Sequence, residues 1–408
     1  MVRAFITGAG FITPIGNSWC EVQSSLRLGK SGIGPISLFD ATNYRTNIAG
    51  EVRNFQASDY MESRAARRMA RSSLFAVAAA RQAVEHAGVE IGDGRHAAVI
   101  MHTGGGGLDV MAEQVAIHDQ RGPRRVSPLL VPMVAPNMAA GQVSIHLGIR
   151  GPVLASTAAC ATGIYALIDA LQLIQRGDAE IVVAGATEAM IIPSVVAGLS
   201  NMGALAPGTG GPTSASRPFD RDRKGFVLSE GAGAFVVESE VHAVRRGAQP
   251  LAEILGGALT SDAFHITEPD PTGEGAARAI TGALEKTGLE AQDIDYICAH
   301  GTGTQLNDTA ETAAIKRAIG DYAYQVPISS PKSIAGHLLG AAGCVSAAAC
   351  LLAINHGIIS PTINLDHPDL ACDLDYVPHV ARRATVKYAL ANGFGFGGQN
   401  AVVALGAA

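Results

Sequence analysis

The order of the predicted elements constrains the fold most, because the chain runs through one pattern twice. The stretch 251–257 resembles 2–8, and the last predicted strand, 397–403, resembles 231–237. Each half alternates apolar strands with helices and ends on a glycine-rich turn followed by a strand. We therefore predict an α/β fold with two duplicated halves and mainly parallel sheets covered by helices.

We place the division between the halves at residue 250, giving units 1–250 and 251–408. The chain is 48% hydrophobic and only 16% charged, so it can bury a large core, and its sparse charge favours a large subunit interface. The net charge of −6 gives no general attraction to nucleic acid or an anionic membrane. No run is expected to be long enough to span a membrane.

The N-terminus leads directly into a predicted strand, Arg3–Thr7, with a turn at Gly8–Gly10, and lacks the pattern of a signal peptide. Six scattered cysteines without a CxxC pair argue against a zinc site or a disulfide framework. They favour a reducing compartment, so we expect a cytoplasmic protein.

Cys160 is the first candidate for chemistry. It lies in the small-residue run 155–163, between the end of an apolar strand and a helix that is predicted to stop at Gly177. A cysteine at a helix N-terminus meets unpaired N–H groups and the helix dipole, which favour a nucleophilic thiolate. The alternative is an ordinary small buried residue, and this stretch alone does not separate the two interpretations.

Two histidines in the second half occupy similar settings. His300 follows the predicted strand 296–299, and His337 follows a strand and loop that begin at Ile328. A further predicted glycine loop, 392–398, contains two phenylalanines. One such histidine is more often structural than catalytic, but three small-residue loops that each carry one reactive group favour a shared active site.

A basic stripe precedes these elements. Its four arginines recur at helical spacing, which predicts one face of a helix that continues to His86. Such a stripe is usually a solvated face, and its functional interpretation is a dock for a small acidic protein. The stripe consists of Arg64, Arg67, Arg68 and Arg71.

Nearly the whole chain resembles the β-ketoacyl-acyl carrier protein synthases of the thiolase superfamily, in particular the elongating type II (FabF-like) enzymes. The resemblance implies a dimer with a five-layer αβαβα fold of two duplicated halves. It also implies a decarboxylating Claisen condensation of an acyl group with malonyl-acyl carrier protein, in fatty acid or type II polyketide or polyene biosynthesis. The matching stretches are 157–163, 216–220, 299–304, 332–343 and 392–398.

The same resemblance implies roles for single residues. Cys160 is the acyl-accepting nucleophile, His300 and His337 complete a Cys-His-His triad, and Lys332 supports them. The N–H groups of Cys160 and Phe396 match an oxyanion-binding pair, and Phe396 also matches a gate. Matches to the substrate channel and acyl pocket are Thr267, Thr302, Thr304, Phe394 and Gly105, and Arg64, Arg67 and Arg68 match the carrier-docking face.

The chain also departs from the family pattern. Cys298, Ser346 and Gly393 replace an asparagine, a glutamate and a serine that hold a monovalent cation or polar cluster, so we expect no metal. Gly105 replaces a bulky residue at the base of the acyl pocket, so we expect a deeper pocket. Gly203 replaces an arginine of the docking face. No cofactor is expected, since phosphopantetheine arrives on the carrier.

These departures favour a specialised pathway over primary fatty acid elongation. They leave open whether the partner is a second copy or a chain-length-factor-like subunit. A non-catalytic chain-length-determining subunit of this fold usually lacks the cysteine that is Cys160 here. A thiolase acting on coenzyme A esters has a second cysteine in its C-terminal glycine loop, and 392–398 has none. A papain-like cysteine hydrolase would leave the two histidines and Lys332 without a role.

Overall fold

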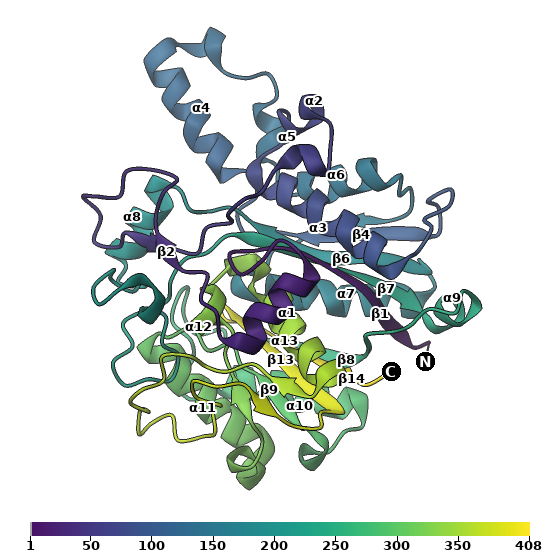
Figure 1. The fold of residues 1–408 in the computed structure, drawn as a ribbon, viewed down its shortest axis with the longest axis vertical. Helices are drawn as coiled ribbons and strands as arrows, with labels where there is room; N and C mark the ends of the chain where they lie inside the picture. The colour runs from purple at the N-terminus through teal and green to yellow at the C-terminus, as the bar shows by residue number, and fades with distance from the viewer. Residues whose placement is uncertain (1) are drawn as a thin grey trace.

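The structure is a computed structural model that describes residues 2–408. Ten strands form one sheet in the order β10-β9-β13-β14-β8-β1-β7-β6-β4-β5 (Figure 1). In the first half these are β1 (Ala4–Ile12), β4 (Ala97–His102), β5 (Val153–Leu154), β6 (Ile181–Glu188) and β7 (Gly231–Ser239). In the second half they are β8 (Ala252–Ser261), β9 (Tyr296–Cys298), β10 (Ile328–Ser329), β13 (Tyr388–Gly395) and β14 (Gln399–Gly406).

The two halves have the same topology, which confirms the predicted duplication. In the first half, β1 and β6 run antiparallel to β7, and β4 runs parallel to β6 and β5. In the second half, β8 and β13 run antiparallel to β14, and β9 runs parallel to β13 and β10. Four of the five strands in each half run in the same direction, as the prediction of mainly parallel sheets requires. In each half the returning strand, β7 or β14, lies antiparallel in the sheet, and a short turn instead of a crossover helix joins β13 to β14.

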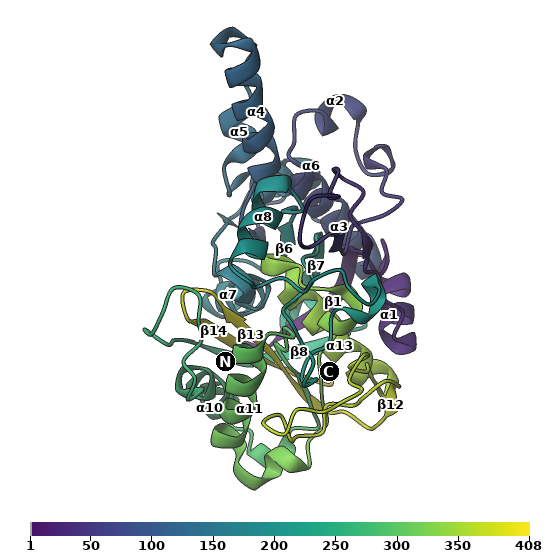
Figure 2. The same ribbon diagram turned by 90° about the vertical axis from the view of Figure 1, so that its left-hand side faces the viewer.

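Helices form three layers around the sheet halves (Figures 1 and 2). One outer layer packs α3 (Arg71–Ala87) and α6 (Met138–Leu147) on the first half. The other packs α10 (Glu274–Thr287), with α11 (Gln305–Ile319) against it, on the second half. Between the halves lie α7 (Thr162–Arg176) and α13 (Ala342–His356), within the largest cluster of buried apolar residues. This arrangement is the five-layer αβαβα fold.

The two central helices approach each other closely where they begin. A Cβ atom added to Gly163 would lie 3.0 Å from Gly343 Cα, and one added to Gly343 would lie 2.6 Å from Ile164 N. Both positions therefore need glycine. The contact brings the segment that follows Cys160 against the segment that follows His337.

One described segment, Leu339–His356, is long and apolar enough to cross a membrane, contrary to the sequence prediction. It contains α13, and 78% of it is buried inside the protein. Its apolar character is that of a central core helix.

The turn predicted at Gly8–Gly10 is wrong, because β1 continues through these residues. Glycine serves the contact with α3 here: a Cβ atom on Gly8 would lie 2.2 Å from Ala83 O, and one on Gly10 would lie 2.1 Å from Ala79 O. The predicted glycine loop 392–398 is likewise partly strand, since β13 extends to Gly395.

The basic stripe does not lie on one continuous helix. A short helix, α2 (Ser63–Ala66), ends before α3 begins at Arg71. Arg71 turns toward the protein, where its Nε donates to Glu230 Oε2 at 2.7 Å. The exposed part of the stripe is therefore Arg64, Arg67 and Arg68.

The helix α4 (Leu108–Arg121) projects from the body of the molecule and was not predicted (Figure 2). The helix α1 (Trp19–Leu28) begins after Ser18, whose side chain caps it by accepting a hydrogen bond from Glu21 N. The other elements are α5 (Leu130–Val134), α8 (Pro193–Asn201), α9 (Glu240–Arg245), α12 (Lys332–Ala335), β2 (Gly34–Pro35), β3 (Ile48–Ala49), β11 (Ile358–Ile359) and β12 (Arg382–Arg383).

Candidate active site

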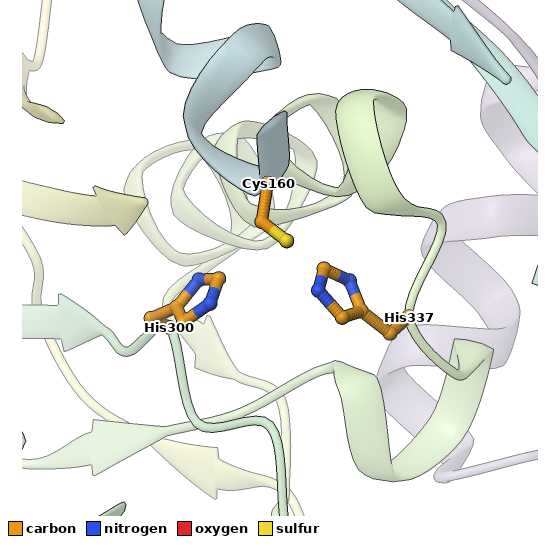
Figure 3. Close-up of side chains that lie close together, drawn as sticks. All are labelled: Cys160, His300 and His337. Carbon is orange, nitrogen blue, oxygen red and sulfur yellow. The ribbon is translucent and has the colours of Figure 1, made fainter. Parts of the chain in front are cut away.

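The fold brings Cys160, His300 and His337 together, although they are far apart in sequence. The Cys160 sulfur and one ring nitrogen of each histidine lie within 4.8 Å of one another. Figure 3 shows the three side chains pointing toward one centre, the cysteine from the start of α7 and the histidines from two loops. All three are buried.

A strained turn presents Cys160. The preceding residue, Ala159, has a φ of 45°, a region that non-glycine residues adopt rarely and mainly at functional sites. A single 3-10 turn, Ala159–Ala161, leads into α7. The Thr162 hydroxyl donates to Ala159 O at 2.7 Å and accepts from Ala158 N at 2.8 Å, which fixes the turn from inside.

Cys160 is a thiol and not the thiolate that its position at a helix start predicts. Burial raises the pKa of Cys160 to about 11, and this effect exceeds the opposing influence of the Lys332 charge. The backbone N–H groups of Phe396 and Cys160 face the sulfur and also lower its pKa. The thiol must therefore lose its proton to a base as it reacts.

Each histidine backbone is fixed by a different partner. His300 N and Gly301 N donate to the two carboxylate oxygens of Glu311, both at 2.7 Å. His337 pairs with a neighbouring segment: its N–H donates to Val227 O at 2.7 Å, and its carbonyl accepts from Ser229 N at 2.9 Å. These backbone hydrogen bonds position both imidazole rings, so the ring nitrogens need no hydrogen bond to the protein.

Both imidazoles are neutral and available. Burial, with the nearby Lys332 charge, holds the pKa of His300 and of His337 well below its usual range. Among the described residues, His300 Nδ1 and both ring nitrogens of His337 are buried without a hydrogen-bond partner. Such unpaired nitrogens are costly unless a ligand satisfies them, so they indicate where substrate oxygen would bind.

Lys332, the first residue of α12, is buried near the triad but does not line the cavity beside it. Burial lowers the pKa of Lys332, and this is opposed by the neighbouring groups Cys298, Glu311 and Cys160. Its charge helps to keep both histidines neutral.

A cavity of about 550 Å³ opens beside the triad. Five residues predicted to contact substrate line it, namely Thr267, Thr302, Thr304, Phe394 and Phe396. Sequence reasoning missed other lining residues, among them Met202, Lys224, Phe226, Leu306 and Asn307. The Phe226 ring lies 5.1 Å from the His337 ring, centre to centre, and only the fold could reveal this contact.

Gly105 does not line this cavity, and the pocket is not deepened there. The Met190 sulfur lies 2.6 Å from where a Gly105 Cβ would be, so the methionine fills the space that the glycine leaves. The sequence showed the missing side chain but not the one that replaces it.

Three of the positions that depart from the family pattern, Cys298, Ser346 and Gly393, lie in the core, whereas Gly203 is exposed and lines the cavity. The Cys298 thiol is within hydrogen-bonding reach of Cys350, Tyr296 and Ser346, a group without a carboxylate. Gly393 lies against the nucleophile turn, where an added Cβ would be 3.2 Å from Ala161 Cα. The absence of a bound cation stays a prediction.

Comparison with known proteins assigns the family. The model of the beta-ketoacyl synthase N-terminal domain matches residues 2–243, and that of the C-terminal domain matches residues 251–366. The chain belongs to the beta-ketoacyl synthase family. It is therefore an acyltransferase that forms carbon–carbon bonds.

Relatives of this ketosynthase match along nearly their whole length. Proteins named 3-oxoacyl-[acyl-carrier-protein] synthase 2 are 45% identical in Synechocystis and 43% identical in Staphylococcus aureus, each alignment covering 98% of this chain and 97% of the relative. The solved ishigamide ketosynthase/chain length factor superposes with a TM-score of 0.94 at 37% identity, covering 100% of this chain and 99% of that one. A type II polyketide ketosynthase solved with its acyl carrier protein gives a TM-score of 0.92 at 31% identity, covering 100% of both chains.

Proposed function

We propose that this ketosynthase transfers an acyl group from a carrier thioester to Cys160 and condenses it with malonyl-acyl carrier protein. The observation that carries the proposal is the buried thiol beside two neutral imidazoles with unpaired nitrogens. In the first step the Cys160 S–H proton passes to a base, the sulfur bonds to the acyl carbon, and the carrier leaves as a thiol. We propose that the N–H groups of Cys160 and Phe396, which face the sulfur, stabilise the oxyanion that forms on the acyl group.

In the second step the malonyl C–C bond breaks, CO₂ leaves, and the electron pair forms an enolate. The enolate carbon attacks the Cys160 thioester, the C–S bond breaks, and the leaving sulfur takes up a proton that comes from solvent. The product is a β-ketoacyl carrier, longer by two carbons. His300 and His337 donate hydrogen bonds to the enolate oxygen, which neutral imidazoles can do from a protonated nitrogen.

The direct test is to mix the ketosynthase with an acyl carrier and malonyl carrier and to identify the products by mass spectrometry. A β-ketoacyl carrier and one CO₂ per turnover are the expected products. Release of free fatty acid would indicate a hydrolase. A reaction with coenzyme A esters and none with carriers would indicate a thiolase-like enzyme.

An acyl carrier protein is the proposed partner, docking on exposed Arg64, Arg67 and Arg68, which form no ion pair within residues 2–408. We propose no cofactor beyond the carrier's phosphopantetheine, a cytoplasmic location, and a specialised polyketide or polyene pathway. These assignments rest on the departures at Cys298, Ser346 and Gly393 and on the scattered cysteines.

We propose that a second subunit binds at the β5 edge of the sheet. The edge strand β5 exposes Val153 and Leu154, and the exposed segment 155–157 leads from it to the nucleophile turn. Such an edge is normally protected, and pairing with another chain would cover it.

We expect lysine at both Val153 and Leu154 to break this pairing, because charge on an edge strand opposes strand addition. Light scattering should give a dimer for the wild type and a monomer for the double variant. A wild-type chain that is monomeric and inactive alone would show instead that it needs a different subunit.

Replacing Met190 with alanine should lengthen the acyl chains that the ketosynthase accepts. The vacated space would bury two more methylenes of the acyl chain, at about 0.8 kcal/mol each. Acylation by chains that are too long for the wild type should then rise roughly tenfold. Intact mass after incubation with a length series of acyl carriers measures this. Met111→Ala, a methionine on α4, is the control, and an unchanged length profile for Met190→Ala would show that the acyl chain does not reach this space.

A further inference from the structure

We propose that Glu188 is a positioning residue that holds the turn after His337 in place for the condensation step. It does so by tying that turn, in the second half, to the loop after β4, in the first half. The inference rests on the proposed function and assigns to Glu188 a role in the second step of that reaction.

The Glu188 carboxylate lies at the end of β6, is fully buried, and accepts four hydrogen bonds. From the loop after β4, Gly104 N donates to Oε2 and Gly105 N to Oε1, both at 3.0 Å, and the Thr103 hydroxyl donates to Oε1 at 3.3 Å. From the other half, Gly340 N donates to Oε2 at 3.1 Å. No cation pairs with this carboxylate anywhere in residues 2–408.

The two loops are shaped around this carboxylate. A Cβ atom on Gly104 would lie 2.6 Å from Glu188 Oε2, and one on Gly340 would lie 2.8 Å from the same atom. Gly340 comes three residues after His337 and begins the approach to α13. A shift of this turn would therefore move the segment that carries the histidine.

The second half shows what such a carboxylate does. β9 occupies the place in the second half that β4 occupies in the first. Glu311 accepts from His300 N and Gly301 N in the loop after β9, as Glu188 accepts from Gly104 N and Gly105 N in the loop after β4. Glu311 fixes the loop that carries His300 by accepting hydrogen bonds from its backbone. Glu188 fixes the turn after His337 in the same way, by accepting from Gly340 N.

The ionised form makes this contact, because a protonated carboxyl would present an O–H toward N–H donors. Burial raises the pKa of Glu188 to about 7, against the four donors that lower it. Other titratable groups on the packed elements are uncharged or paired: Cys160 and Cys344 are thiols, Arg71 pairs with Glu230, and His102 bonds Asp169. Condensation should therefore fall with acid as Glu188 takes up a proton near pH 7.

The test is Glu188→Gln, which keeps the size but turns an NH₂ group toward two of the donors. We expect acylation of Cys160 within about threefold of wild type and condensation lower by roughly 10- to 100-fold in kcat, because small misplacements cost this much. The loss of rate near pH 7 should disappear. The thermal midpoint should stay within about 3 °C of wild type, since no buried charge remains to be desolvated.

A second variant, Thr103→Val, keeps Glu188 and removes one donor. Loss of that donor should raise the pH at which condensation begins to fall while leaving the rate at high pH intact, which a purely structural defect would not do. Wild-type rates and pH profile in both variants would overturn the proposal. If Glu188→Gln lowers acylation and condensation equally, Glu188 does not act by positioning His337 for condensation. A wild-type protein without acyl-enzyme would instead reject the proposed function itself.

Discussion

Replacing Cys160 with alanine should abolish the acyl-enzyme and lower condensation by at least about 10⁴-fold, the scale seen when a covalent nucleophile is removed. The loss is expected to be this large because the first product is bonded to that sulfur. The substitution removes one buried atom from a turn held by Thr162, so the fold should persist.

Intact-mass spectrometry after incubation with acyl carriers of different lengths measures this directly. The wild type should gain one acyl group, and the variant none. Cys20→Ala is the matched control, because Cys20 is the exposed cysteine among those described. An acyl adduct that persists on Cys160→Ala would show that another residue is the nucleophile.

The wild type and Cys160→Ala also test whether the Cys160 sulfur is a thiol or a thiolate in the free enzyme. Burial raises the pKa of Cys160 to about 11, so the thiolate fraction is small at neutral pH. Alkylation that depends on Cys160 should rise about tenfold per pH unit between pH 7 and pH 10. A rate that levels off below pH 8 would indicate a preformed thiolate stabilised by the start of α7.

The site could be located from the sequence because its residues lie in long, ordered motifs. Cys160, His300 and His337 converge as predicted, and the cavity contains Thr302, Thr304 and Phe396. The duplicated fold was also predictable, since the repeat in the element order is a repeat in the sheet.

What the sequence could not supply depends on packing between distant segments. Gly8 and Gly10 signal a turn locally, yet they serve a close contact between β1 and α3. Met190 occupies the space beside Gly105 although 85 positions separate them in the printed sequence. The pKa of Cys160 is likewise set by burial, which outweighs the helix start that the local pattern shows.

Replacing either histidine with alanine should separate the two steps of the reaction. Removing one donor from a developing oxyanion costs roughly 10²- to 10³-fold, so His300→Ala and His337→Ala should each lower decarboxylation by this amount. Acylation of Cys160 should fall less, because the N–H groups of Cys160 and Phe396 are untouched. Release of CO₂ from malonyl carrier measures one step, and intact mass measures the other.

His242→Ala is the control, since this histidine lies on α9 and bonds Glu238 outside the cavity. The pKa of each active-site histidine lies well below its usual range, so neither ring should titrate between pH 6 and pH 8 when followed by NMR. A ring that gains a proton in this window would be a cation in the free enzyme, and the proposed hydrogen-bond donation by neutral imidazoles would then be wrong.

A variant that carries both His300→Ala and His337→Ala tests whether the two rings bind the same oxygen. His337 has both ring nitrogens unpaired and His300 has Nδ1 unpaired, while their ring centres lie 5.6 Å apart, so one oxygen can lie between them. If both rings donate to that oxygen, the first alanine substitution already weakens binding of the enolate. The second substitution then removes a donor that contributes less than it does in the wild type. The combined loss should then be smaller than the product of the single losses. Losses that multiply would place the two histidines in separate steps.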